Sequence, residues 1–227
     1  MKGTLVNTAT VLIGAGIGYF VGARLPERIR SIVMQGLGLV TLLLGVRMIL
    51  ATQGSDAVLK VAGALLLGGI TGELLKIEQG LERVGEYLKA KVQSSSSTFV
   101  LGFVSASLLF CVGPMTIVGS IEDGVRGDAT ILYTKSVMDS VAAIALASSL
   151  GVGVFFSAIT VLLIQGGLTL LGSQIGALSQ PAVIDNLTST GGAMILGISF
   201  RLLNIASIRV ANFLPALVFV IFFSLWL

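Results

Sequence analysis

Long apolar stretches separated by short polar segments make up most of this 227-residue chain. A membrane-spanning helix needs about 20 mostly apolar residues, and the alternating pattern typical of strands is not seen. Because backbone polar groups must be paired within lipid, each long stretch is predicted to be a helix. The predicted spans cover residues 4–23, 31–51, 57–75, 98–119, 130–150, 152–176, 186–206 and 209–227. The pattern predicts an all-α integral membrane protein with about eight transmembrane helices.

One polar segment, residues 76–92, has a helical rather than a loop pattern. Ile77, Leu81, Val84 and Leu88 recur at spacings of three and four, while charged residues such as Glu78 lie elsewhere around the helix. This spacing predicts an amphipathic helix at the membrane surface. The alternative is a solvated tether, followed by a flexible hinge of serines at 94–97.

Composition supports the membrane prediction. Hydrophobic residues make up 55% of the chain and charged residues 11%, whereas soluble domains carry about 25% charged residues. A soluble globular enzyme is therefore excluded. The 29 glycines are about twice the usual share and suit helices that pack closely in lipid. A net charge of +3 is too small to indicate nucleic-acid binding.

Several catalytic groups are missing from the sequence. It contains no histidine and one cysteine, Cys111, so neither an internal disulfide nor a usual zinc site is expected. The Gly-x-Ser-x-Gly turn of serine hydrolases is also missing. We therefore expect no catalytic residues, no metal site and no cofactor. Any coupling to protons would have to use carboxylates or Lys135.

Basic residues between the predicted spans indicate an orientation. The stretch after Lys2 is read as the first span, because Arg24, Pro26 and Arg28 follow it instead of a cleavage site. One side of the membrane receives eight basic residues and the other three, so the richer side is predicted to be cytoplasmic. The N-terminus is then outside. The C-terminus is also outside with eight spans, and inside with seven.

The sequence has a weak internal duplication. Thr10, Gly16 and Gly22 align with Thr160, Gly166 and Gly172 without gaps, and two further matches follow after small shifts: Gly38 and Arg47 with Gly192 and Arg201, and Lys60 with Arg209. Spans one to three then resemble spans six to eight. An offset of five spans reverses their direction, as in the inverted-topology repeats of many transporters. Chance similarity among apolar helices is the alternative.

The duplication gives one transmembrane domain over residues 1–227 with four parts. Repeat A covers residues 4–75, the amphipathic helix 76–92, the central segment 98–150 and repeat B 152–227. The central segment holds most of the candidate site residues.

The fourth predicted span is interrupted by Gly113 and Pro114. Proline removes an amide donor and displaces the helix, and irregular backbone at membrane depth is tolerated only inside protein or beside a watery cavity. Thr116 and Ser120 supply hydroxyls for such a cavity. We therefore expect a broken or re-entrant central helix, with a simple proline kink as the alternative.

Three acidic residues follow the break within seven positions: Glu122, Asp123 and Asp128. Their carboxylates could bind a hard cation, although the glycine spacing does not match a calcium loop. The alternative is a solvated loop whose acids pair with Arg126.

Lys135 and Asp139 are the strongest candidates for a functional site. They lie four residues apart, so they share one face of the fifth predicted span. Ionisable groups within a span are costly and often mark an ion or substrate pathway. The alternative is a purely structural ion pair. Glu73, near the end of the third span, is a weaker candidate.

The central segment also carries a family resemblance. The sequence ASLLFCVGPMTIVGSIEDGVRGD, followed by LYTKSVMDS, resembles the bacterial membrane proteins grouped as domain-of-unknown-function family 554, the YqgA/YdfK-like proteins. The resemblance extends over nearly the whole chain, including the opening GTLVNTATVLIGAGIG. It implies a bacterial cytoplasmic-membrane location and a helical, multi-spanning fold. It implies no activity, substrate or catalytic residue.

These features predict a small secondary transporter that moves an ion or small solute across the lipid bilayer. Asp139 would be the coupling carboxylate, and Lys135 its charge partner or the contact for an anionic group. A homodimer would form through the glycines of residues 14–22 or 63–72. The alternatives are an ion channel or facilitator, and a membrane scaffold that transports nothing.

Overall fold

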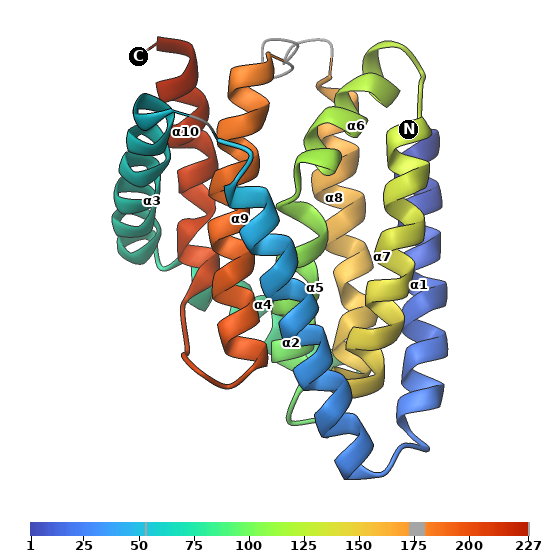
Figure 1. Ribbon diagram of the computed structural model, residues 1–227. Helices are drawn as coiled ribbons and strands as arrows, with labels where there is room; N and C mark the ends of the chain where they lie inside the picture. Colours follow the sequence, from blue (N-terminus) through green and yellow to red (C-terminus); the bar gives the residue numbers. More distant parts are fainter. Residues whose placement is uncertain (53, 173–179, 227) are drawn as a thin grey trace. The chain divides into compact units, whose positions relative to one another are not determined.

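The computed structural model describes residues 1–52, 54–172 and 180–226. All regular structure in these ranges is helical, which confirms the all-α prediction. The helices are α1 (Lys2–Gly22), α2 (Glu27–Ile49), α3 (Ser55–Leu75), α4 (Ile77–Lys91), α5 (Phe99–Cys111), α6 (Pro114–Val125), α7 (Thr130–Leu150), η1 (Gly151–Phe156), α8 (Ser157–Leu170), α9 (Pro181–Leu202), η3 (Val210–Phe213) and α10 (Leu214–Trp226) (Figure 1).

Four helical segments of the described chain are long and apolar enough to cross a membrane. They are Lys2–Gly22, Glu27–Ile49, Ser55–Leu75 and Thr130–Leu170, and the bent pair α5–α6 makes a fifth if it is counted as one span. The predicted spans at 186–206 and 209–227 fall on α9 and α10, which are not among these segments. Positions 173–176 and 227 of the predicted spans lie outside the described residues. Eight spans therefore stay a prediction.

The segment Thr130–Leu170 is a hairpin of two helices. Along α1, Gly14 faces Ser140 and Gly18 faces Ile144, so α1 and α7 are parallel. Thr4 and Asn7 of α1 bond Thr169 and Gln165 in the reverse order, so α1 and α8 are antiparallel. Helices α7 and α8 thus run in opposite directions, joined by η1, where Gly151 has φ +79°.

The break in the fourth predicted span is confirmed, and the helix after it is longer than expected. Helices α5 and α6 meet at a bend of 59°. Pro114 is the first residue of α6, a position where its missing amide costs no hydrogen bond within α6 itself. Because α6 continues to Val125, Glu122 and Asp123 lie on a helix, and the alternative of a solvated loop was wrong for these two residues.

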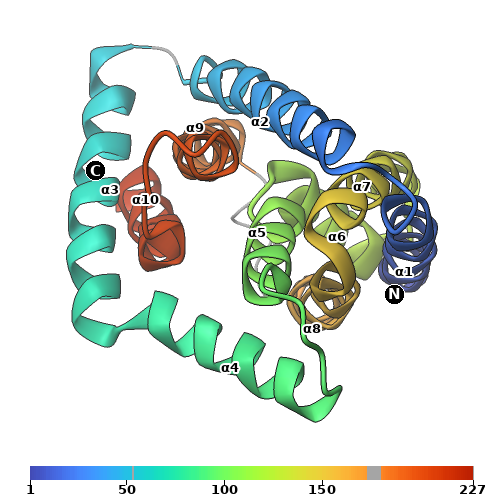
Figure 2. The same cartoon turned by 90° about the horizontal axis from the view of Figure 1, so that it is seen from below.

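The chain forms two compact units, which are described one at a time. Unit 1 consists of Met1–Leu37, Glu82–Cys111 and Met115–Gly176. Its most extensive described helix contact joins α1 and α7, which lie side by side (Figures 1 and 2). A Cβ on Gly14, Gly18 or Gly22 would lie 2.5, 2.2 or 2.2 Å from the carbonyl oxygens of Ser140, Ile144 and Ser148. These glycines let the two backbones touch, as small residues do in membranes.

Unit 2 consists of Gly38–Leu81, Val112–Pro114 and Ala177–Leu227. In this unit, glycines again allow close packing, here of α3 against α10 and the short helix before it. A Cβ on Gly68 would lie 2.4 Å from the backbone nitrogen of Ala216, and one on Gly72 would lie 1.8 Å from the carbonyl oxygen of Asn212. The glycine faces at 14–22 and 63–72 therefore contact helices of the same chain. The homodimer itself stays a prediction.

Helix α4 confirms the helix predicted at 76–92 but not the expected position of Glu78. The prediction placed Glu78 away from the apolar face, yet Glu78 is only 3% exposed. Val84, which was predicted to lie on the apolar face, is 49% exposed. The buried carboxylate accepts hydrogen bonds from Arg201 (2.8 Å) and from the amide of Ala211 (2.7 Å). These bonds fix the start of α4 within unit 2.

Candidate functional site

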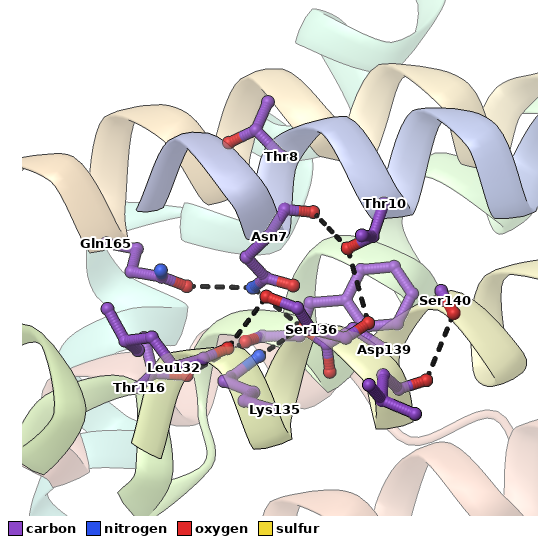
Figure 3. Close-up of polar contacts among 12 residues, drawn as sticks. Asn7, Thr8, Thr10, Thr116, Leu132, Lys135, Ser136, Asp139, Ser140 and Gln165 are labelled. Carbon is purple, nitrogen blue, oxygen red and sulfur yellow. Dashed lines mark hydrogen bonds and ion pairs between the residues drawn. The ribbon is translucent and has the colours of Figure 1, made fainter. Parts of the chain in front are cut away.

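A buried ion pair lies at the centre of the candidate site. Lys135 and Asp139 are 5% and 8% exposed, and the Lys135 ammonium contacts Oδ2 of Asp139 (Figure 3). Asp139 is the tenth of the 21 residues of α7, so it lies midway along this helix. The structure confirms that the two side chains share a helix face. Desolvation makes such a pair expensive, and further hydrogen bonds are needed to offset that cost.

Asn7 of α1 supplies one of these bonds. Its Nδ2 donates to Oδ2 of Asp139 at 3.0 Å and to Oε1 of Gln165 at 2.9 Å. Asn7 and Gln165 are fully buried. One amide nitrogen thus joins α1, α7 and α8 in the middle of unit 1.

From Gln165 the polar contacts continue toward the start of α1. Gln165 Nε2 donates to Thr4 Oγ1 at 3.3 Å, and the hydroxyls of Thr4 and Thr169 lie 3.1 Å apart. We call these six residues the interior polar cluster: Thr4, Asn7, Lys135, Asp139, Gln165 and Thr169. All six are buried.

Sequence reasoning identified only Lys135 and Asp139 of this cluster. Asn7 and Gln165 each stand as a large polar residue inside a predicted apolar span, at 4–23 and 152–176. An amide side chain within lipid needs a partner just as a charged one does, so this feature could have identified both residues. The sequence does not show which residues bond to these two amides, because those residues lie on other helices.

The polar face of α6 is turned into unit 1. Thr116, Ser120 and Asp123 are spaced four and three residues apart, and all are buried. Oδ2 of Asp123 accepts a hydrogen bond from the amide of Gly3 at 3.0 Å and lies 2.9 Å from the nitrogen of Met1. Asp123 therefore holds the start of α1 against α6.

Thr116 compensates for the break at Gly113 and Pro114. Its Oγ1 donates to the carbonyl oxygen of Phe110 at 3.0 Å. This carbonyl lies four residues before Pro114, so it is the group that loses its helical donor when proline replaces an amide. Both Gly113 and Pro114 are half-buried.

Four buried polar atoms of unit 1 have no hydrogen-bond partner among the described residues, and two of the four belong to residues discussed above. These two are Oδ1 of Asn7 and Oγ of Ser120. Native proteins leave few such atoms unpaired unless water or a ligand reaches them.

The other predicted site residues lie elsewhere. Glu122 pairs with Arg126 at 3.2 Å, so the pairing expected in the loop alternative is present although Glu122 lies on a helix. Asp128 is exposed, and the hydroxyl and then the amide of Thr130 hold the pKa of its carboxyl below its usual range. Three metal-ligating residues do not come together anywhere in the part of the chain that the structure describes.

Glu73 belongs to unit 2. It contacts Arg209 and accepts a hydrogen bond from Nδ2 of Asn212 at 2.6 Å. Its side chain is about half exposed. This pair ties the end of α3 to the segment before α10, and Glu73 has no described bond to the interior polar cluster.

Comparison with known proteins places this arrangement in a family. The profile of the family described as "Protein of unknown function (DUF554)" matches residues 2–225. The chain belongs to this family. The resemblance of the central segment is thereby confirmed over nearly the full length.

Two relatives of the DUF554 chain align with it over 220 residues each. "Uncharacterized protein YqgA" of Escherichia coli strain K12 is 30% identical, covering 95% of this chain and 92% of the relative. "Uncharacterized membrane protein YdfK" of Bacillus subtilis strain 168 is 29% identical, covering 96% and 93%. No solved structure matches the chain. The name of YdfK and the apolar helical segments agree that this DUF554 chain is a membrane protein.

Proposed function

We propose that this protein is a small secondary transporter of the bacterial cytoplasmic membrane, which moves an ion or small solute by alternating access. The observation that carries the proposal is the interior polar cluster. It joins Lys135 and Asp139, midway along α7, to Thr4 and Thr169 near the ends of α1 and α8. Buried ionisable groups linked to a helix end by polar side chains suit a solute or proton pathway.

Each residue of the cluster has a role in this proposal. Asp139 is the coupling carboxylate, and Lys135 neutralises it in the resting state. When an ion or proton binds Asp139, the Lys135 ammonium is released to contact an anionic group or water. Asn7 and Gln165 keep the carboxylate oriented. The unpaired Oδ1 of Asn7 and hydroxyl of Ser120 offer binding atoms to the solute.

Two features of unit 1 support an alternating-access mechanism. Helices α1 and α8 correspond to the first and sixth predicted spans, and they run antiparallel. An inverted repeat of these two spans requires opposite directions. The bend between α5 and α6 provides the discontinuous helix on which such transporters often build their sites. With the positive-inside rule, the same proposal places the N-terminus outside.

The proposal is tested by reconstituting the full chain in proteoliposomes and screening ions and small metabolites for uptake. Asp139→Asn and Lys135→Ala should each abolish uptake or uncouple it from the driving ion. Asp56→Asn is the matched control, because Asp56 forms the same i,i+4 pair with Lys60 at 2.9 Å but its side chain is 79% exposed. Uptake that survives both cluster variants would refute the assigned roles.

The alternatives give different results in the same vesicles. Thousands of ions per second without a driving co-ion would identify a channel. Continued absence of any flux in well-folded protein across the screen would favour a scaffold, in which the pair has a structural role only.

A further inference from the structure

We propose a second site in unit 1, a cavity that binds a small oxyanion of the phosphate or carboxylate class. The cavity has a volume of about 240 Å³ and lies at the end of α1 and α7 opposite to Met1 and Asp123. Its wall is formed by the last turns of α1 and α7, by Arg30 of α2, and by the serine segment 94–96 with Thr98. The inference does not rest on the transport proposal.

Arg30 supplies the positive charge. It is the one formally charged residue among those that line the cavity. Its Nη2 donates to the carbonyl oxygen of Gly22 at 3.0 Å, which fixes the guanidinium against the end of α1. Nε is buried and has no partner within the described chain. A carboxylate or phosphate matches a guanidinium edge with two parallel N–H···O bonds.

The acidic side chain near Arg30 does not satisfy it. Glu27 lies 3.8 Å from Nη1, and its side chain is 85% exposed. That distance is beyond hydrogen-bond range, and a solvated pair of this kind contributes little. The guanidinium therefore keeps donors for a ligand in the cavity.

Ser149 supplies a second donor that lacks a partner. It lines the cavity, it is 6% exposed, and its hydroxyl has no hydrogen bond to any described residue. Its neighbour Ser148 differs, because it already donates to the carbonyl oxygen of Ala145 at 2.8 Å. A buried hydroxyl without an acceptor is unfavourable, and an oxyanion oxygen in the cavity would provide that acceptor.

The remaining wall favours the same ligand. Thr98 donates its hydroxyl proton to the carbonyl oxygen of Leu150 at 2.9 Å, and Ser96 donates to Thr98 at 3.1 Å, so these two hydroxyls fix the wall and leave the donation to Arg30 and Ser149. Thr98 also directly precedes α5, whose positive N-terminal end therefore lies at this wall. The free hydroxyl of Ser149, the helix N-terminus and the guanidinium together favour a small anion over a cation.

The oxyanion could be free in solution or part of a lipid headgroup, and two measurements separate these sources. In the first, the full chain in neutral phosphatidylcholine nanodiscs is titrated with inorganic phosphate, and broadening of the ³¹P resonance reports binding. In the second, nanodiscs containing phosphatidylglycerol are used, and native mass spectrometry counts the lipids that stay bound.

Whichever of the two measurements detects binding, Arg30→Gln should weaken that binding by roughly ten- to a hundredfold. This is the range expected for one charge-assisted hydrogen bond. Arg28→Gln is the control, because Arg28 lies on the same helix, is exposed and does not line the cavity. Ser149→Ala removes a hydroxyl that bonds nothing in the described chain, so it leaves the fold intact and should weaken binding several-fold. Equal effects of the Arg30 and Arg28 variants, or no binding in either measurement, would overturn the proposal.

Discussion

The hydroxyl of Thr116 donates a 3.0 Å hydrogen bond to the carbonyl oxygen of Phe110, the group four residues before Pro114. Pro114 has no amide proton to offer that carbonyl. Without the bond from Thr116, a buried acceptor beside the bend would have no protein partner. Thr116 therefore replaces the donor that Pro114 lacks, and this replacement allows a broken helix in an apolar environment.

This relationship predicts a non-additive pair of substitutions. Thr116→Val should destabilise the native chain by about 1–3 kcal/mol, the cost of leaving a buried polar group unsatisfied. In a Pro114→Ala background the restored amide can bond Phe110, so the same Thr116→Val change should cost much less. Thermal unfolding in detergent, followed by circular dichroism, measures both costs. Equal costs in the two backgrounds would show that Thr116 stabilises something other than the break.

A second non-additive pair is predicted for Lys135 and Asp139. Removing one member of a buried ion pair costs about 3–5 kcal/mol, because the other charge is left uncompensated. Lys135→Met and Asp139→Leu should each cost this amount, whereas the double variant should recover most of the loss. Unfolding midpoints of the four proteins measure the coupling.

The same double variant separates a structural role from a functional one. If the pair has a role in transport, the double variant is stable but inactive in proteoliposomes. If the pair is only structural, restored stability should bring restored flux, and that result would contradict the transport proposal.

The sequence was sufficient to predict the elements and the candidate pair. Apolar length located α1, α3 and α7 to within a few residues, and the spacing of Lys135 and Asp139 fixed their shared face, since both features are local. It was not sufficient to predict the partners. Asn7 meets Asp139 and Gln165 only because α1 packs against both α7 and α8, and single-sequence periodicity carries no information on which helices are neighbours.

Glycine shows the same difference between local and tertiary information. Its abundance correctly indicated close helix packing, but the sequence did not show that Gly14, Gly18 and Gly22 contact α7 of the same chain. The buried position of Glu78 was missed for a related reason. A carboxylate on an amphipathic helix is normally solvated, and only its partners Arg201 and Ala211 make burial favourable.

The tight contact between α1 and α7 predicts opposite effects for two glycine substitutions. Gly18→Ala would place a Cβ 2.2 Å from the carbonyl oxygen of Ile144, so the helices must separate, at a cost of about 1–3 kcal/mol. Gly167→Ala on α8 meets no described atom within 4 Å and should be neutral or stabilising by up to about 1 kcal/mol. Thermal unfolding of the two variants tests this, and similar destabilisation by both would contradict the contact.

The loop before α7 gives a pH-dependent prediction. Because the hydroxyl and amide of Thr130 bond the Asp128 carboxylate, its pKa lies below its usual range in the folded chain. The stabilisation is therefore present above the unfolded pKa of about 3.9 and is lost as the pH falls through the lower folded value. Thr130→Val should raise the pKa of Asp128 toward the unfolded value. Carbon-detected NMR of labelled aspartate measures this pKa, and Thr134→Val is the control.

The last prediction concerns the buried carboxylate of Glu78. Its two oxygens accept separate bonds, Oε1 from Arg201 and Oε2 from the amide of Ala211. Glutamine keeps the shape but has one oxygen, so Glu78→Gln must present an NH₂ group to one of these donors. The loss should be about 1.5–3 kcal/mol for a charge-assisted bond, and hydrogen exchange at the Ala211 amide should accelerate. Glu86→Gln, at an exposed position of the same helix, should change neither. Unchanged protection of Ala211 in Glu78→Gln would show that this bond does not fix the start of α4.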